Sequence, residues 1–224
     1  MNIENNRLIL FGVNNLDNNY YENNKVSVTG IVLTEPQYSH TICGENFYLF
    51  RLQIPRLSEN ADNINVTISE RFFVSYKPEI GDCVIINGQF RSYNNFSDVG
   101  NKLILTVFVK DLLKADADVN MQNPNNIYLN GFICKPPIYR TTPFQREITD
   151  ILLAVNRSYN KSDYIPCIAW GRNAKFAENL AVGTNLAIWG RIQSREYQKR
   201  VGEDSVETKT AYEVSISKME IKEL

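Results

Sequence analysis

The sequence contains one histidine and no closely spaced pair of cysteines. His40 lies three residues before Cys43, and the other three cysteines stand far from it and from one another along the 224 residues. A zinc site takes about four converging ligands, and this spacing supplies at most two of them. We therefore expect no metal and no cofactor.

Motifs that carry catalytic chemistry are also missing. There is no glycine-rich phosphate loop and no Gly-x-Ser-x-Gly, and a nucleophile has only His40 to pair with. Carboxylate pairs exist, but nothing in the pattern singles one out. We therefore expect a binding protein and not an enzyme.

Long apolar segments are absent as well. No apolar run reaches the roughly 18–20 residues that a membrane-spanning helix needs. The first six residues, Met1–Asn6, lack the basic start and apolar centre of a secretory signal. With 43% hydrophobic residues the chain can still bury a core. A cytoplasmic protein is the expectation.

Neither sign of charge dominates, since the net charge is −1. The distribution is uneven, however. Residues 127–224 carry 14 Lys and Arg against 11 Asp and Glu (net +3), whereas residues 1–126 carry 10 against 14 (net −4). A partner with a negative charge is therefore expected at the second half of the chain.

The first half shows five short apolar runs separated by turns, which predict an all-β unit over residues 25–115. The predicted strands are Val26–Leu33, Asn46–Ile54, Val66–Ser75, Cys83–Tyr93 and Lys102–Leu112. Residues 1–24 are predicted to be an N-terminal extension, in which Leu8–Phe11 is the one apolar run. Residues 116–126 are polar and aperiodic and are predicted to be a linker.

After the linker the pattern repeats with an offset of 101 or 102 residues. Gly30 and Pro36 correspond to Gly131 and Pro137, and Gly88 corresponds to Gly190. A nearly constant offset indicates a tandem duplication, with the second copy over residues 127–224. In that copy Asn173–Leu180 has apolar residues at helical spacing between the third and fourth strands. We expect two tandem OB-fold barrels of five strands, each with at most a short helix between strands three and four.

Aromatic and basic residues alternate along Leu152–Arg200 in the second copy. Unstacked bases present flat apolar faces flanked by charged phosphates, so this combination on a sheet favours single-stranded nucleic acid. The basic residues are Arg157, Lys161, Arg172, Lys175, Arg191, Arg195, Lys199 and Arg200.

The second copy also resembles bacterial single-stranded DNA-binding proteins. The resemblance rests on Leu129-Asn130-Gly131, Leu153–Arg157, Ala169–Arg172 with the helix that follows, Ile188–Ile192 and Ser194–Tyr197. The first copy matches only in its framework. The resemblance implies base stacking at four positions, which fall on Tyr159, Tyr164, Trp170 and Tyr197, with the basic residues above along the phosphates.

The resemblance further implies an assembly of four barrels, which two barrels per chain give as a homodimer. It implies work on DNA in replication, recombination or repair, in association with the bacterial nucleoid. The family's usual acidic tail is not present at Met219–Leu224, so recruitment of replication or repair proteins through a tail is not expected.

Other interpretations remain open from the sequence. One is a primosome-type accessory protein that mainly contacts other proteins, and another is an OB scaffold for protein contacts alone. Trp189 suits a base or a barrel–barrel interface, and we favour the interface. The first copy offers aromatic and basic residues in an acidic setting, so that DNA binding there stays open: Phe72, Phe73, Tyr93, Phe96, Arg56, Arg71, Lys77 and Arg91.

Overall fold

The computed structural model describes residues 22–56, 58, 60–97, 100–116, 122–200 and 206–223. The apolar run Leu8–Phe11 lies outside the described residues, and so do residues 117–121 of the predicted linker. The side chains of residues 94–102, 199 and 200 are likewise outside the description.

Six strands form the first barrel, over residues 24–114. They are β1 (Asn24–Val32), β2 (Gln37–Ile42), β3 (Glu45–Pro55), β4 (Ala61–Ser69), β5 (Cys83–Ser97) and β6 (Gly100–Lys114), with the short 3-10 helix η1 (Glu70–Val74) between β4 and β5. Each inner strand places alternate residues in the core, as the period of two predicts.

Six equivalent strands form the second barrel, over residues 125–221. They are β7 (Asn125–Ile133), β8 (Ile138–Thr141), β9 (Glu147–Arg157), β10 (Lys161–Trp170), β11 (Asn185–Arg200) and β12 (Val206–Ile221). The helix α2 (Arg172–Glu178) lies between β10 and β11 and buries Ala174 and Ala177. The all-β architecture with short helices at these two places is as the sequence predicts.

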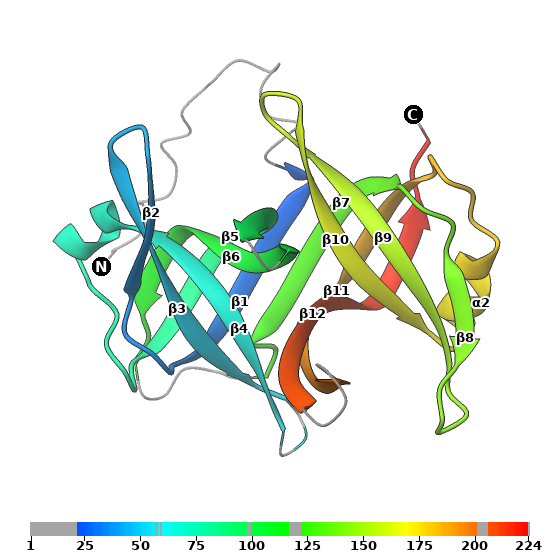
Figure 1. Cartoon of the computed structure of the whole chain (residues 1–224), viewed down its shortest axis with the longest axis horizontal. Helices are drawn as coiled ribbons and strands as arrows, with labels where there is room; N and C mark the ends of the chain where they lie inside the picture. The colour runs from blue at the N-terminus through cyan, green and yellow to red at the C-terminus, as the bar shows by residue number, and fades with distance from the viewer. Residues whose placement is uncertain are drawn as a thin grey trace, which may run out of the picture.

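All twelve strands belong to one continuous sheet that curls into two barrels (Figure 1). Its order is β2-β3-β4-β6-β5-β1-β7-β11-β12-β10-β9-β8, and the pairings β3–β1 and β7–β9 close the two barrels. The barrels meet where β1 pairs antiparallel with β7, and there Val26 lies opposite Ile127. Those two residues are 101 positions apart, so each barrel presents the same position to the other and a pseudo-twofold axis passes between them.

The two cores use equivalent residues, which confirms the repeat in space. Val28, Leu52 and Ile64 of the first barrel are fully buried, and so are Leu129, Leu153 and Ile165, each 101 residues later. The bulge at which β5 shifts register against β6, between Asn87 and Gly88, recurs between Trp189 and Gly190 in β11.

The repeated glycine of that bulge has a steric cause. A Cβ atom at Gly190 would lie 2.2 Å from the carbonyl oxygen of Ser215, and one at Gly88 would lie 2.2 Å from that of Phe108. At both positions backbone atoms occupy the space that a Cβ atom would need, so only glycine fits without movement of the neighbouring strand.

Two parts of the predicted strand pattern are wrong. The third strand of the first copy was expected to reach Ser75, but β4 ends at Ser69 and the next five residues form η1. Ser69 caps that helix, since its hydroxyl accepts a hydrogen bond from the N–H of Arg71 at 3.2 Å. The strand also begins at Ala61, before the predicted start at Val66, because its alternate residues Asp62 and Ile64 face the interior.

The edge strands β2 and β8 were missed. Both follow a proline, and their side chains are mostly half-exposed or exposed, so they lack the apolar alternation that marks a strand. Pairing with β3 and β9 holds them in the sheet.

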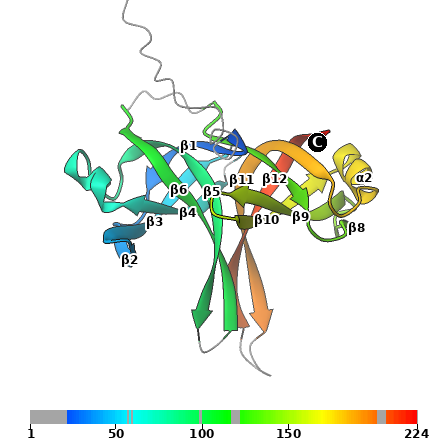
Figure 2. The same cartoon turned by 90° about the horizontal axis from the view of Figure 1, so that it is seen from above.

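Two long hairpins leave the body of the molecule. Figure 2 shows that β5–β6 and β11–β12 project together in the same direction from the two barrels. The β11–β12 pairing runs from Leu186 opposite Ile221 to Arg200 opposite Val206. This hairpin carries Tyr197, one of the four predicted stacking positions.

Candidate nucleic-acid interface

Strand β10 has one face toward the core and one face toward the outside of the barrel. Ile165, Cys167 and Ala169 are buried in the core, whereas Tyr164 is 49% exposed on the opposite face and Trp170 lies on that face at the end of the strand. Two of the predicted aromatics therefore share the outer side of one strand.

The other two aromatics flank this strand. Tyr159 lies in the turn between β9 and β10, has a φ of 62°, and is 94% exposed. Tyr197 lies on the β11–β12 hairpin and is 39% exposed. Both rings are open to solvent, as a base-stacking residue requires.

One edge of the Trp170 indole is held by a hydrogen bond. Its Nε1–H donates a hydrogen bond to the Ser215 hydroxyl on β12 at 3.1 Å. The bond satisfies the polar atom of the ring and orients the indole on the outer face of the sheet.

The predicted basic residues divide into groups by their neighbours. Lys161, Arg172 and Arg195 are exposed near the aromatic positions. Lys175 is exposed too, and its ammonium lies 3.0 Å from a carboxylate oxygen of Glu147. Lys199 and Arg200 close β11, and their side chains lie outside the described residues.

Arg157 and Arg191 have buried carboxylates as partners. Arg157 lies 3.4 Å from Asp163, which is fully buried, and Arg191 lies 3.6 Å from Asp62, which is 1% exposed. Burial raises the pKa of Asp163, while the N–H of Ser92 and the Arg157 guanidinium act in the opposite direction.

The first barrel lacks the four aromatic positions. By the offsets of the repeat, Tyr159, Tyr164, Trp170 and Tyr197 correspond to Ser58, Asn63, Ser69 and Asn95. All four replacements are polar, so the two barrels present different chemistry at equivalent places.

Aromatic residues of the first barrel gather elsewhere. The guanidinium of Arg91 lies 3.7 Å from the centre of the Phe108 ring, and Phe47 contacts the same ring at 5.7 Å. Phe108 lies at the position of Ser215, next to the place that Trp170 takes in the second barrel. Sequence reasoning missed this cluster, and only the register of β4 against β6 identifies it.

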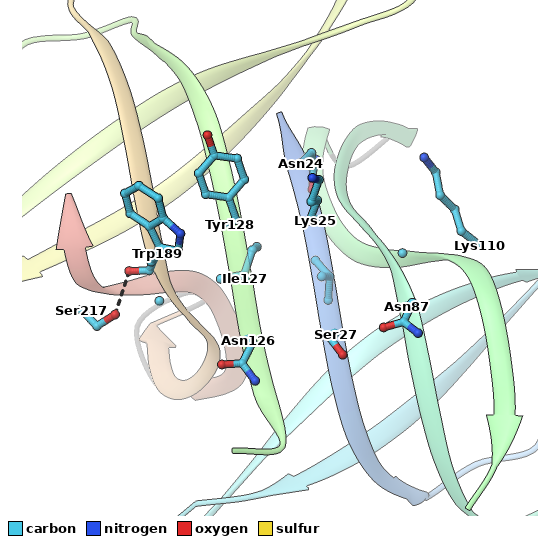
Figure 3. Close-up of a pocket in the computed structure, with 13 residues that line it drawn as sticks. Asn24, Lys25, Ser27, Asn87, Lys110, Asn126, Ile127, Tyr128, Trp189 and Ser217 are labelled. Carbon is cyan, nitrogen blue, oxygen red and sulfur yellow. Dashed lines mark hydrogen bonds between the residues drawn. The ribbon is translucent and has the colours of Figure 1, made fainter. Parts of the chain in front are cut away.

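A hollow of about 490 Å³ lies on the outer face where the barrels meet (Figure 3). Trp189 lines it with Tyr128, the two ring centres being 5.1 Å apart. The ammonium of Lys218 lies 4.6 Å from the centre of the Trp189 ring. Trp189 is thus at the junction of the barrels, away from the outer face of β10.

Two classes of feature are not found in the part of the chain that the structure describes. No three His, Cys, Asp or Glu side chains there gather as metal ligands. No helix among these same residues has the length and apolar character to cross a membrane.

The second barrel matches a known family. Residues 124–222 fit the model of the single-strand binding protein family. Over these residues the second barrel is similar to that family.

Named relatives agree with the family match. Single-stranded DNA-binding protein 1 of Streptococcus pyogenes serotype M18 (strain MGAS8232) is 36% identical over 86 residues, which are 35% of this chain and 66% of the relative. Single-stranded DNA-binding protein 1 of Staphylococcus aureus (strain COL) is 35% identical over 85 residues, or 35% and 51% of the two chains. This chain thus spans between half and two thirds of the length of these relatives.

A solved structure is similar over both barrels. The wild-type single-stranded DNA-binding protein from Thermus aquaticus has a TM-score of 0.69, with 90% of this chain and 93% of that chain covered at 18% identity. At this identity the likeness concerns the fold. It extends the resemblance from the single barrel matched by the family to the tandem arrangement.

Proposed function

We propose that this protein binds single-stranded DNA without strong sequence preference and protects it in replication, recombination or repair. The observation that carries the proposal is the set of aromatics on the second barrel. Tyr159, Tyr164 and Tyr197 expose their rings beside exposed cations, and Trp170 lies on the same outer face as Tyr164. Stacking on such rings contributes roughly 1–3 kcal/mol per base, and cations near them suit the phosphates.

The proposed activity is binding and not catalysis, and it needs no cofactor. Its site of action is DNA in the bacterial cytoplasm, in keeping with the bacterial sources of the named relatives.

Titration with oligo-dT and with a duplex of equal length tests this function. We expect tighter binding of the single strand, with an affinity that falls as salt rises because phosphate contacts release counterions. The Trp189→Phe variant makes Trp170 the one fluorescent indole, and oligo-dT should quench it. Equal affinity for single strand and duplex contradicts the proposal.

Assembly as a homodimer with four barrels is the second part of the proposal. The outer face at the barrel junction supports it, since Trp189, Tyr128 and Lys25 line an open hollow there and Trp and Tyr are enriched in protein interfaces. Light scattering should give twice the chain mass of 25.7 kDa for the wild type. A Trp189→Asp variant should give the single mass, and a monomeric wild type contradicts the homodimer.

A second candidate function is a primosome-type accessory role, in which the chain chiefly contacts replication or repair proteins. The polar residues at the four equivalent positions of the first barrel favour it, because one barrel is then free for other contacts. Unquenched Trp170 fluorescence with oligo-dT, together with capture of a defined replication protein, would support this role over DNA protection.

A further inference from the structure

The base of the β11–β12 hairpin is bonded to the first barrel through one residue, Ser194. Its N–H donates to Asp62 at 2.8 Å, and its hydroxyl accepts from the N–H of Asn63 at 2.9 Å. Its carbonyl accepts from Arg56 at 3.3 Å. Three polar groups of one residue are thus held by β4 and the end of β3.

The pseudo-twofold axis generates a reciprocal contact. The N–H of Ser92, at the base of the β5–β6 hairpin, donates to Asp163 at 2.7 Å. The Ser92 hydroxyl accepts from the N–H of Tyr164 at 2.7 Å. The residue pairs Asp62–Ser194 and Asp163–Ser92 are related by the offsets of the repeat, and we call each pair a clamp.

Each clamp is built around a buried carboxylate with guanidinium partners. Arg56 contacts Asp62 twice, at 2.5 and 2.8 Å, and Arg191 lies 3.6 Å away. Because Asp62 is 1% exposed, its charge is tolerable only when it is paired and hydrogen-bonded. Arg191, one of the basic residues expected at the phosphates, thus also has a carboxylate partner in the first barrel.

The clamps act where the second barrel needs support. A two-stranded ribbon is marginally stable alone, and Tyr197 lies only three residues beyond Ser194 along the hairpin. Tyr164 is bonded directly through its N–H to Ser92. Two of the four aromatic positions are therefore placed by hydrogen bonds from the acidic first barrel.

We propose that the first barrel positions the DNA-binding surface of the second, with Asp62 and Ser92 as the positioning residues. The proposal rests on the proposed function and adds to it a role for the barrel that lacks the four aromatics. Asp62 holds the hairpin that carries Tyr197, and Ser92 holds the backbone at Tyr164. Neither residue needs to touch the DNA.

The Asp62→Ala variant tests the proposal in the full-length protein. We expect binding of oligo-dT to weaken about tenfold, as befits the loss of a charge-assisted hydrogen bond. Removal of a negative charge alone would strengthen binding to a polyanion, so a weaker complex points to positioning. The matched control is Asp82→Ala, which removes a largely buried, ion-paired carboxylate bonded within the first barrel. It should leave DNA affinity within about twofold of the wild type. The bonding partners of Asp82 lie within the first barrel, and changes at distant sites that share no partner act independently.

A double-mutant cycle separates positioning from general destabilisation. Asp62→Ala and Tyr197→Ala should be non-additive for oligo-dT affinity, since one acts through the other, whereas Asp62→Ala and Tyr159→Ala should be additive. Additivity in both cycles, or equal losses in the Asp62→Ala and Asp82→Ala variants, overturns the proposal.

Ser92→Ala provides an independent arm in case Asp62→Ala does not fold. It removes the hydroxyl that accepts from the Tyr164 N–H and donates a long bond, 3.5 Å, to Asp163, and it keeps the backbone bond to Asp163. We expect it to weaken oligo-dT binding and to be non-additive with Tyr164→Ala; additivity, or unchanged affinity, counts against positioning. A wild type that fails to bind oligo-dT refutes the proposed function itself, whereas a binding wild type with additive variants refutes only the clamps' role.

Discussion

Asn24 bonds both backbone polar groups of Phe90. Its Nδ2 donates to the Phe90 carbonyl at 2.7 Å, and its Oδ1 accepts from the Phe90 N–H at 2.9 Å. Asn125 makes the same two bonds to Ile192, 102 residues after Phe90, at 2.7 and 2.9 Å. Asn24 begins β1 and Asn125 begins β7, the two strands that pair at the junction. Each asparagine thus bonds the backbone N–H and carbonyl of one residue on the long hairpin of its own barrel.

Replacement of Asn24 by alanine should lower the free energy of unfolding by about 1–3 kcal/mol, because two buried backbone groups lose their partner. Asn125→Ala should have a smaller effect, since Asn125 is half-exposed whereas Asn24 is 3% exposed. Urea unfolding measures both. Asn126→Ala, an exposed neighbour, is the control, and a loss as large there would contradict the assignment.

Tyr159→Ala should weaken single-strand binding by about 1–3 kcal/mol while stability stays within about 0.5 kcal/mol of the wild type. The ring is 94% exposed, so its removal takes little from the core, and the proposed function assigns it to base stacking. Fluorescence anisotropy with labelled oligo-dT and thermal unfolding give the two quantities. Phe144 lies on the loop before β9 and is 87% exposed, and the Phe144→Ala variant is the control. Equal losses of affinity in the two variants would show that exposure alone, and not position, determines binding.

Trp170 should act through its aromatic face and not through its hydrogen bond. Trp170→Phe keeps a ring but loses the bond to Ser215, so its affinity for oligo-dT should fall less than that of Trp170→Ala, for which we expect a loss of about 1–3 kcal/mol. Ser215→Ala removes the same hydrogen bond and keeps the indole. If Ser215→Ala weakens binding as much as Trp170→Ala does, orientation by the hydrogen bond matters more than stacking.

Much of this arrangement follows from local pattern. The offset between Gly88 and Gly190 predicted the duplication, since a bulge that leaves no room for a Cβ atom restricts both positions to glycine. The alternation along β10 placed Tyr164 opposite Ile165 correctly. These features depend on neighbours within one strand or on a single repeated residue, and the sequence carries both.

Contacts between the copies could not be predicted in the same way. Asp62 and Ser194 are 132 residues apart, and nothing near Asp62 marks it as a buried carboxylate. The sequence likewise gives no sign that Arg191, which is expected at the phosphates, lies 3.6 Å from Asp62. The pairing of β1 with β7 brings these residues together, and that pairing is a property of the folded chain.

Gly190→Ala should destabilise the second barrel strongly, by about 3 kcal/mol or more, because the added Cβ would lie 2.2 Å from the Ser215 carbonyl oxygen. Thermal unfolding measures the change. Ser217→Ala is the control on the paired strand, since it removes only an exposed hydroxyl bonded to the Trp189 carbonyl at 3.0 Å. A Gly190→Ala protein as stable as Ser217→Ala would mean that β12 moves freely away from the bulge.

Acid stability should depend on Asp82. Its carboxylate accepts hydrogen bonds from the Tyr76 hydroxyl at 2.5 Å and from the Glu79 N–H at 3.0 Å, and it pairs with Lys114 at 2.7 Å. Lys114 and then Tyr76 lower the pKa of Asp82 to about 2. In the unfolded chain an aspartate titrates near pH 4, at about 3.9.

The folded state therefore binds fewer protons than the unfolded state between pH 4 and pH 2, so stability falls as the pH drops through that window. Above pH 4 the contribution of Asp82 is fully present. Asp82→Asn should thus be less stable than the wild type at pH 6, and the difference should shrink as the pH approaches 2. Urea unfolding across this range measures it, with Asp111→Asn on β6 as the control for loss of an exposed carboxylate. A difference between Asp82→Asn and the wild type that stays constant from pH 6 to pH 2 would show that Lys114 and Tyr76 do not stabilise the ionised form.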